Sequence, residues 1–153
     1  ALLELTDAGL LAQAFEWAAT GRAPSGQTFN ITNGDVFVLA HVWVALAEWF
    51  GLSCIGPAPA TFARFFSEPA SEQAWEALAR REHLTEPSLP RLLGQSHHYL
   101  DLLTSARVAA KSAPVLLSTI HLRQAGFAGC LDSRDALRRQ LAQMVQLDLL
   151  PSF

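Results

Sequence analysis

Residues 29–35 of the chain read Phe29-Asn30-Ile31-Thr32-Asn33-Gly34-Asp35. Apolar and polar residues alternate over the first four positions, which is the pattern of a strand with one buried face. The Asn33-Gly34 pair tolerates positive φ and predicts a sharp turn. Asp35 is then expected to cap a helix that runs from Val36 to Phe50. A strand that turns into a helix is an α/β unit, which places backbone and polar side chains at a ligand crevice.

The composition is that of one apolar domain. The chain has 153 residues, of which 50% are hydrophobic and 16% charged, and this length is sufficient to bury a core. We therefore expect a single domain over residues 1–153. The apolar excess predicts either an alanine-rich helical core or a surface that packs against further protein. A net charge of -3 and the lack of a basic stripe argue against nucleic-acid binding.

The cysteines and the most apolar segment indicate a cytoplasmic protein. Cys54 and Cys130 are far apart, without the paired spacing of a zinc site or disulfide framework, and are expected as buried or partly buried free thiols. Residues 36–52 contain His41 and Glu48 and fall short of the roughly 20 residues that span a bilayer. The first residues do not have the pattern of a signal peptide. We expect a cytoplasmic location and no membrane contact.

Helical periodicity and capping residues dominate the remainder, so the predicted fold is α/β and predominantly helical. Helices are expected over residues 7–20, 36–50, 60–66, 71–83, 92–107, 118–125 and from 132 to the approach of Pro151. Gly126 is expected to end a helix in a left-handed conformation, and Asp132 to cap the last one. Val115–Leu117 is a candidate second strand that is too short to assign from its pattern alone.

Apolar spacing also predicts which side chains are buried. In the first helix one face carries Leu10, Leu11, Ala14, Phe15 and Ala18. In the last helix a stripe carries Leu137, Leu141, Met144 and Val145. Three tryptophans are interpreted as core or interface anchors, namely Trp43, Trp49 and Trp75.

Three local patterns imitate known sites and are assigned to ordinary structure. Gly21–Thr28 has the glycine spacing of a P-loop, but it lacks the lysine and runs from helix to strand, so it predicts a turn. His97 and Asp101 are spaced to bind one metal ion from a helix, but no third ligand lies nearby. Ser96 beside His97 lacks the elbow that exposes a catalytic serine. We expect no metal site and no catalytic residue.

Four segments together resemble a known family. They are Thr6-Asp7 at a helix start, the Phe29–Asp35 motif, Leu93–Tyr99 (Leu-Gly-Gln-Ser-His-His-Tyr) and Leu117–Phe127 (Leu-Ser-Thr-Ile-His-Leu-Arg-Gln-Ala-Gly-Phe). In this order they resemble the carboxyl-terminal, substrate-binding part of extended short-chain dehydrogenase/reductases of the NAD-dependent epimerase/dehydratase type. The likeness is to the subgroup of progesterone 5β-reductase and iridoid synthase-like enzymes and their bacterial relatives. It covers nearly the whole chain.

The resemblance implies NAD(P)H chemistry whose central parts are absent from these residues. Such enzymes have a glycine-rich dinucleotide loop and a Tyr-x-x-x-Lys dyad. Here the nine glycines form no such loop, Tyr99 and Lys111 are too far apart, and Leu103 stands where the lysine would be. The chain is therefore expected to be a fragment or separate domain without activity or bound cofactor. Its missing Rossmann part would lie upstream or on another chain, with NAD versus NADP and reductase versus epimerase left open.

The resemblance also suggests the substrate contacts. The matching stretch in the reductases contributes aromatic residues to the substrate pocket, which makes His97, His98 and Tyr99 candidate substrate-binding residues, on even terms with a core role. Asn33 is expected to serve the turn first and the pocket second. An apolar pocket with few charges favours a carbonyl or enone compound over a nucleotide sugar.

Two other functions remain open. The chain could be a stand-alone small-molecule binding module that has lost the chemistry. It could also be a helical interaction protein whose apolar surface holds a partner or a second copy of itself.

Overall fold

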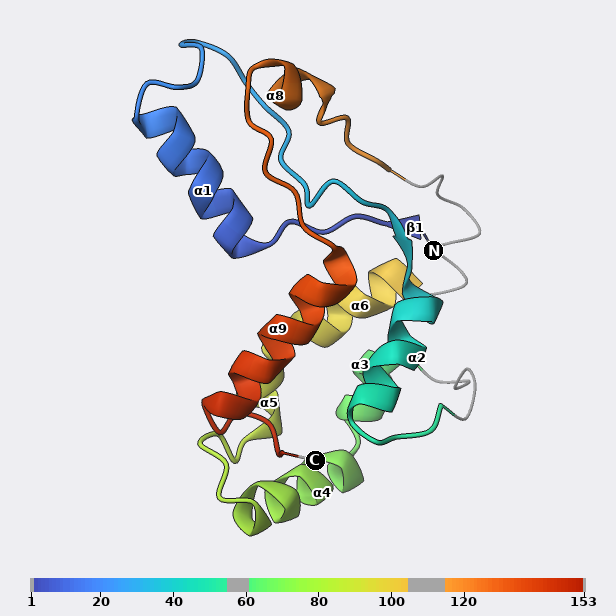
Figure 1. Cartoon of the computed structure of the whole chain (residues 1–153). Helices are drawn as coiled ribbons and strands as arrows, with labels where there is room; N and C mark the ends of the chain where they lie inside the picture. Colours follow the sequence, from blue (N-terminus) through green and yellow to red (C-terminus); the bar gives the residue numbers. More distant parts are fainter. Residues whose placement is uncertain (1, 55–60, 105–114, 153) are drawn as a thin grey trace. The chain divides into compact units, whose positions relative to one another are not determined.

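The computed structural model describes residues 2–54, 61–104 and 115–152. Figure 1 shows the elements in chain order: β1 (Leu2–Leu3), α1 (Ala8–Ala19), β2 (Phe37–Val38), α2 (Leu39–Trp49), α3 (Phe62–Phe66), α4 (Pro69–Arg81), α5 (Leu89–Leu93), α6 (Ser96–Thr104), α8 (Ile120–Gln124) and α9 (Ser133–Gln146). The predominantly helical α/β class is thus confirmed for these residues. No helix among them is both long and apolar enough to cross a bilayer.

The contacts divide the chain into two compact units. The β-ribbon unit comprises Leu2–Trp43 and Pro114–Arg139, and the helical unit comprises Val44–Ala113 and Gln140–Phe153. Helices α2 and α9 contribute residues to both units. The single substrate-binding domain expected over residues 1–153 stays a prediction.

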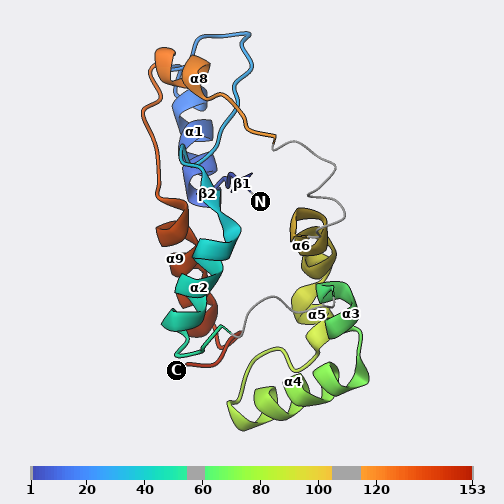
Figure 2. The same cartoon turned by 90° about the vertical axis from the view of Figure 1, so that its right-hand side faces the viewer.

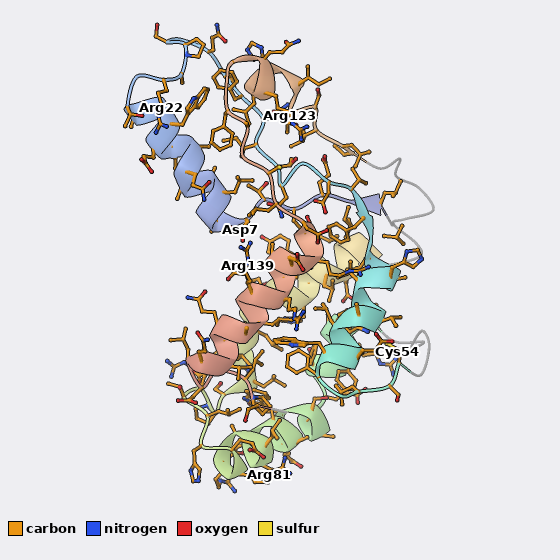
Figure 3. All side chains as sticks on the ribbon, in the orientation of Figure 1. Asp7, Arg22, Cys54, Arg81, Arg123 and Arg139 are labelled. Atoms are coloured by element: carbon orange, nitrogen blue, oxygen red, sulfur yellow. The ribbon has the colours of Figure 1, made fainter. Side chains whose placement is uncertain are left out.

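Helix α1 starts as its sequence predicts. Asp7 lies at its N-terminus (Figure 3), and its carboxylate accepts hydrogen bonds from the backbone N–H groups of Gly9 and Leu10. These bonds satisfy two of the donors that a helix start leaves unpaired. The predicted cap and helix are confirmed.

The buried face of α1 is only partly the predicted one. Leu10, Ala14 and Trp17 are buried, at positions i, i+4 and i+7 of one stripe. Phe15, expected inside, is 62% exposed. The predicted burial of Phe15 was therefore wrong, and so was that of Ala18, which is also exposed, because the buried stripe runs through Trp17.

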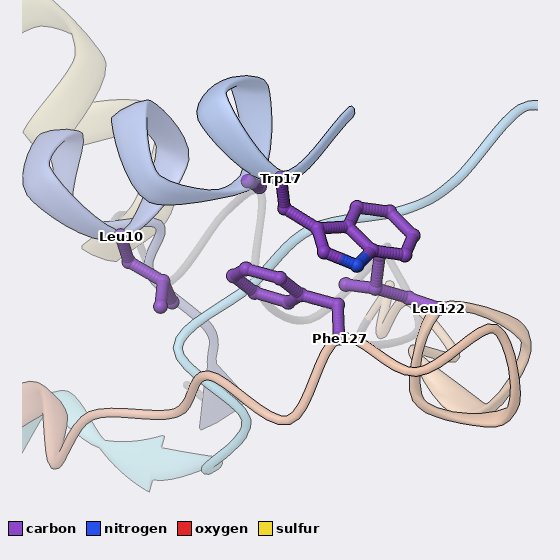
Figure 4. Close-up of a cluster of buried hydrophobic side chains, with 5 residues drawn as sticks. Leu10, Trp17, Leu122 and Phe127 are labelled. Atoms are coloured by element: carbon purple, nitrogen blue, oxygen red, sulfur yellow. The ribbon is translucent and has the colours of Figure 1, made fainter. Parts of the chain in front are cut away.

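Trp17 is at the centre of the core of the β-ribbon unit. Its ring lies 5.5 Å from that of Phe127 and 5.6 Å from that of Phe29, between centroids. Figure 4 shows the Trp17 indole beside the Phe127 ring, with Leu10 and Leu122 also facing this cluster. Tilted and edge-to-face rings at this spacing add attraction beyond the burial of their surface.

A left-handed glycine brings Phe127 into this core. At the end of α8, Gly126 has a φ of 103° and its N–H donates to the carbonyl of Arg123. The N–H of Phe127 donates to the carbonyl of Leu122. This pair of bonds is the Schellman motif, so the predicted helix end is confirmed.

The segment predicted as a strand over residues 29–32 is extended but belongs to no sheet. Phe29 and Ile31 pack against the core while Asn30 is exposed, as the alternation predicts, but Thr32, expected on the polar face, is buried at 5% exposure. The sheet instead pairs β1 with β2, antiparallel, with Leu2 opposite Val38. The strand prediction was wrong for these residues, because a strand needs a ladder of backbone partners along one edge.

The second candidate strand is wrong as well. Val115, Leu116 and Leu117 adopt no strand, and their side chains are exposed. The N–H of Leu117 donates to the carboxylate of Glu4. A single side-chain acceptor cannot replace a neighbouring strand.

Short helices pack on one another in the helical unit. Helix α3 packs against α4 and α6, and α4 against α5; Figures 1 and 2 both show α3 beside α6. In α4, Ala79 is buried and Trp75 and Leu78 are half-buried, as the spacing predicts. Trp49 is half-buried too, whereas Trp43 is 45% exposed, so a fully buried core position is wrong for Trp43 and its interface role stays a prediction.

The single helix predicted over residues 92–107 is two helices in the described part. Helix α5 ends at Gly94, which has a φ of 52°, and α6 begins at Ser96. A residue with positive φ interrupts the α-helical hydrogen bonding, and glycine adopts it without strain. Residues 105–107 lie outside the described part of the chain.

The last helix starts as predicted but ends earlier, at Gln146 and not at the approach of Pro151. Asp132 accepts a hydrogen bond from the N–H of Asp135 at the start of α9. The predicted stripe is half-buried, and it consists of Leu137, Leu141, Met144 and Val145.

Two helices end on residues that are strained in the left-handed region. His83, after α4, has a φ of 56°, and Asp148, after α9, has a φ of 53°. Each holds a Schellman motif, in which Leu84 N–H donates to the carbonyl of Ala79 and Leu149 N–H to that of Met144.

Replacing His83 by glycine should therefore stabilise the protein. We expect the free energy of unfolding to rise by about 0.5–1 kcal/mol, because glycine removes the steric cost of positive φ. Urea denaturation of His83→Gly measures it. The neighbouring Glu82→Gly variant is the control, since Glu82 has a φ of -92° and should lose stability. Equal losses in the two variants would contradict the strain at His83.

Candidate functional site

Asn33 is 1% exposed and forms hydrogen bonds with both its side chain and its backbone. Its side-chain Oδ1 accepts from the N–H of Asp7 at 2.7 Å, and its Nδ2 donates to Ser133 Oγ at 3.1 Å. Its backbone N–H donates to the carbonyl of Leu5, and its carbonyl accepts from the N–H of Leu131. Asn33 therefore connects three segments that are distant in sequence.

Asp35 caps a helix, but not the predicted one. Its carboxylate accepts from the N–H of Ser133 at 2.9 Å and from Ser133 Oγ at 2.6 Å, at the start of α9. The helix that follows Asp35 in sequence, α2, begins only at Leu39. The cap prediction is thus corrected: the anion stabilises the N-terminus of a helix 98 residues away. We call Asp7, Asn33, Asp35 and Ser133 the Asn33 hub.

Gly34 turns the chain at the hub and must remain glycine. Its φ is 100°, and a Cβ there would lie 2.7 Å from Arg123 Nη2 and 3.4 Å from Cys130 Cβ. The turn predicted from Asn33-Gly34 is confirmed. The approach of Arg123 carried no sequence signal, because it comes from α8.

The other three candidate residues lie on α6, in the helical unit. His97 is half-buried, His98 is exposed and Tyr99 is 66% exposed. The rings of His97 and His98 have centroids 4.1 Å apart, and the Phe66 ring of α3 meets His97 edge-on at 6.3 Å. The buried Nδ1 of His97 has no hydrogen-bond partner in the structure.

Asp101, one turn after His97, forms its side-chain hydrogen bonds with α3. Its two carboxylate oxygens accept from the N–H groups of Phe62 at 2.7 Å and Ala63 at 2.8 Å. Asp101 therefore satisfies donors at the start of α3 rather than pairing with His97 around an ion. Within residues 2–54, 61–104 and 115–152, no three metal-binding side chains come together.

The candidates thus form two clusters, one in each unit. Asn33 belongs to the β-ribbon unit, and its side-chain donor and acceptor are both engaged inside the protein. His97, His98 and Tyr99 belong to the helical unit. The assignment of all four to substrate binding stays a prediction, and Lys111 lies outside the described residues.

The β-ribbon unit has a cleft that was not predicted from the sequence. It has a volume of about 310 Å³ and is lined by Gln13, Glu16, Trp17, Arg22, Gly126, Phe127, Ala128 and Gly129. Its charged groups, Arg22 and Glu16, lie 3.7 Å apart and are exposed. Because these charges largely neutralise each other in water, the cleft has no strong preference for an anion or a cation.

The cysteines are free, as predicted, but they are not buried. Cys54 and Cys130 are both exposed. The expectation of buried or partly buried thiols was therefore wrong.

Comparison with known proteins identifies plant relatives. No family model matches the chain. An (S)-8-oxocitronellyl enol synthase from Antirrhinum majus is 26% identical over 153 residues, 98% of this chain and 37% of that protein. An enol synthase of the same name from Nepeta cataria is 45% identical over 53 residues, 35% of this chain and 13% of its own.

A steroid reductase is similar too. The 3-oxo-Delta(4,5)-steroid 5-beta-reductase of Arabidopsis thaliana is 31% identical over 85 residues, which are 55% of this chain and 22% of the reductase. The chain thus spans little more than a third of the length of the relative that it matches along almost all its residues. The similarity to enol synthases and steroid 5β-reductases expected from the motifs is confirmed.

Removal of the Asn33 side chain should unfold the β-ribbon unit more readily. Asn33→Ala leaves the part-buried N–H of Asp7 without an acceptor and removes the bond that Ser133 Oγ accepts, although Ser133 still donates to Asp35, so we expect a loss of roughly 1–3 kcal/mol in unfolding free energy. Asn30→Ala is the matched control, because the exposed Asn30 makes one side-chain bond of 3.2 Å to Ser118 and should lose under about 1 kcal/mol. Chemical denaturation measures both. Similar losses of stability in the two variants would contradict the stabilising role of the Asn33 side chain.

Proposed function

We propose that this chain is the substrate-binding part of an NAD(P)-dependent reductase or epimerase-like enzyme of the extended short-chain dehydrogenase/reductase type. The observation that carries the proposal is the similarity over 98% of the chain to an (S)-8-oxocitronellyl enol synthase. The steroid 5-beta-reductase similarity supports it. The sequence itself has neither a glycine-rich dinucleotide loop nor a Tyr-x-x-x-Lys dyad, so hydride transfer needs a further part.

The segment at residues 28–32 supports the proposal that a further part of the enzyme packs against this chain. It has the alternation of a strand, and Phe29 and Ile31 anchor it on the core. On one side it is held by Thr6 Oγ1, which donates to the carbonyl of Ile31. The backbone groups of Thr28 and Asn30 form no backbone hydrogen bond with the described residues. An edge of this kind accepts an added strand, which the nucleotide-binding part would supply.

In the assembled enzyme the two parts would have separate tasks. The bound NAD(P)H would supply the hydride, and the further part would hold it together with the Tyr-Lys pair. This chain would select and orient the substrate through His97, His98 and Tyr99. The aromatic surroundings of these residues favour an uncharged carbonyl or enone compound. We propose a cytoplasmic location, consistent with two exposed free thiols.

The activity of a longer product tests this assignment. We expect the protein made from the longest reading frame that contains residues 1–153 to oxidise NADPH or NADH with an enone substrate. The purified chain alone should oxidise neither. Hydride transfer by the purified chain alone would contradict the proposal.

The strand edge can be tested by one substitution. Asn30→Pro removes the backbone N–H that an added strand would use, so activity of the longer protein should fall at least tenfold. Asn30→Ala removes the same side chain but keeps the N–H, and should retain activity within about threefold. Equal activities of the two variants would exclude this edge as the site of strand addition.

A further inference from the structure

The cleft of the β-ribbon unit is bordered by main chain that has no hydrogen-bond partner. It is lined by residues of α1 and by residues 126–129, which follow α8. The N–H groups of Ala128 and Gly129 donate no hydrogen bond to the described residues, and the four carbonyls of residues 126–129 accept none from them. Each residue of this kind carries one donor and one acceptor. A ligand in the cleft therefore meets free donors and free acceptors together.

Packing against the core explains why this part of the cleft has little side-chain cover. Gly126 has a φ of 103°, which favours glycine. A Cβ on Gly129 would lie 2.7 Å from Cζ of Phe127 and 2.9 Å from Cδ1 of Leu10. A larger residue at either position would strain the backbone or displace the aromatic core. The exposed main chain is therefore a consequence of the fold.

Trp17 adds an unpaired donor to the lining of the cleft. The residue is 6% exposed, and its Nε1 donates to none of the described residues. Buried indole N–H groups usually have an acceptor. Within the described residues, the fully covered side-chain atom that lacks a partner is His97 Nδ1, so Trp17 Nε1 keeps contact with solvent. Because Trp17 lines the cleft, a bound molecule can supply the acceptor that the protein does not.

The charges of the cleft favour a neutral ligand. Arg22 Nη2 and Glu16 Oε1 lie 3.7 Å apart, and their side chains are 60% and 71% exposed. An anion attracted by Arg22 is repelled by Glu16, and the reverse holds for a cation. A charged ligand would thus lose hydration without gaining a net electrostatic attraction. The remaining polar side chain of α1 in the lining, Gln13, is an uncharged amide.

We propose that this cleft is a binding site for a small uncharged aryl amide. The amide carbonyl accepts from Trp17 Nε1, and the amide N–H groups donate to the free carbonyls of residues 126–129. A primary amide carries an acceptor and donors in one plane, which matches the groups that the cleft leaves unpaired. The volume of about 310 Å³ is at the lower end of the range for small-molecule sites, and the ring of the ligand packs beside Trp17 and Phe127.

This site is separate from the substrate contacts proposed above. Its lining residues all belong to the β-ribbon unit, whereas His97, His98 and Tyr99 belong to the helical unit. The inference therefore does not depend on the enzyme relationship, and it assigns the chain a second ligand.

The test is a titration of the full 153-residue chain, labelled with ¹⁵N, with three probes of nearly equal shape. Benzamide has the amide, acetophenone replaces its NH₂ by a methyl group, and benzoate replaces it by a charged oxygen. We expect benzamide to bind with a dissociation constant on the order of 1 mM, as suits a molecule of this size. Acetophenone and benzoate should each bind about tenfold more weakly, because each lacks the donated hydrogen bond.

The spectrum reports where the probe binds. Benzamide should shift the indole N–H resonance of Trp17 and the backbone resonances of Ala128 and Gly129. The indole resonances of the other three tryptophans serve as internal controls and should not move; they are Trp43, Trp49 and Trp75.

A matched pair of variants tests the cleft without altering the core. Ala128 is exposed and lines the cleft, so Ala128→Leu should fill it and weaken benzamide binding at least tenfold. Gln124 is exposed on α8 and lies outside the lining, so Gln124→Leu adds a similar apolar side chain and should bind within twofold of the native chain. Unchanged resonances of α9 in both variants show that the fold is kept.

Three results would each overturn the proposal. They are an unmoved Trp17 indole resonance in benzamide, binding of acetophenone or benzoate as tight as that of benzamide, and native affinity in Ala128→Leu. Hydride transfer by the longer protein is a different measurement, so its success or failure does not change this comparison.

Discussion

The buried amide of Asn33 is the constraint on which the β-ribbon unit depends. A side-chain amide has donors and an acceptor that water would satisfy, and burial makes each of them costly unless it is paired. Here they pair with Asp7 and Ser133, at the starts of α1 and α9. The two helix starts and the turn at Gly34 are therefore fixed together, since moving any one of them leaves a buried polar group without a partner.

The hub has a consequence for the aromatic core beside it. The chain enters the hub from Phe29 and Ile31, and leaves the core at Phe127 shortly before Leu131 bonds Asn33. Trp17 packs on both sides of this path, against Phe29 and Phe127. Polar and apolar contacts thus hold the 28–32 segment extended, and little conformational entropy remains to be lost if it pairs with another strand.

The helical unit is organised differently, and this difference suits a role in recognition. Its helices α3 and α5 have five residues each, which is too short to be stable alone, so packing and caps such as Asp101 maintain them. Exposed apolar side chains are present on both α3 and α6, among them Phe65 and Leu102. An unpaired His97 nitrogen in such surroundings is costly for folding, and costs of this kind are common at binding sites.

Local rules predicted the parts of the fold that depend on neighbours in sequence. Asp7 and Asp132 cap helices, Gly126 ends one and Gly34 turns the chain, because each acts within a few residues. The prediction of a strand at residues 29–32 was wrong because a strand forms only beside a partner strand, and sequence periodicity does not show whether a partner is present.

Long-range contacts account for the other errors. Asp35 was expected to cap the helix that follows it, yet its carboxylate accepts hydrogen bonds from Ser133, 98 positions away. For the candidate site, the sequence indicated His97, His98 and Tyr99 but not the unpaired Nδ1. Asp101, one helical turn away, bonds α3, a contact between segments about 39 positions apart.

Amide hydrogen exchange at the hub tests the central role of Asn33 most directly. The N–H of Asp7 donates to Asn33 Oδ1, and the N–H of Leu131 donates to the Asn33 carbonyl. If the hub holds the β-ribbon unit together, both should exchange only when the unit unfolds, as slowly as the most protected amides of α1. Exchange of these two amides as fast as that of the exposed loop at residues 24–28 would contradict the account.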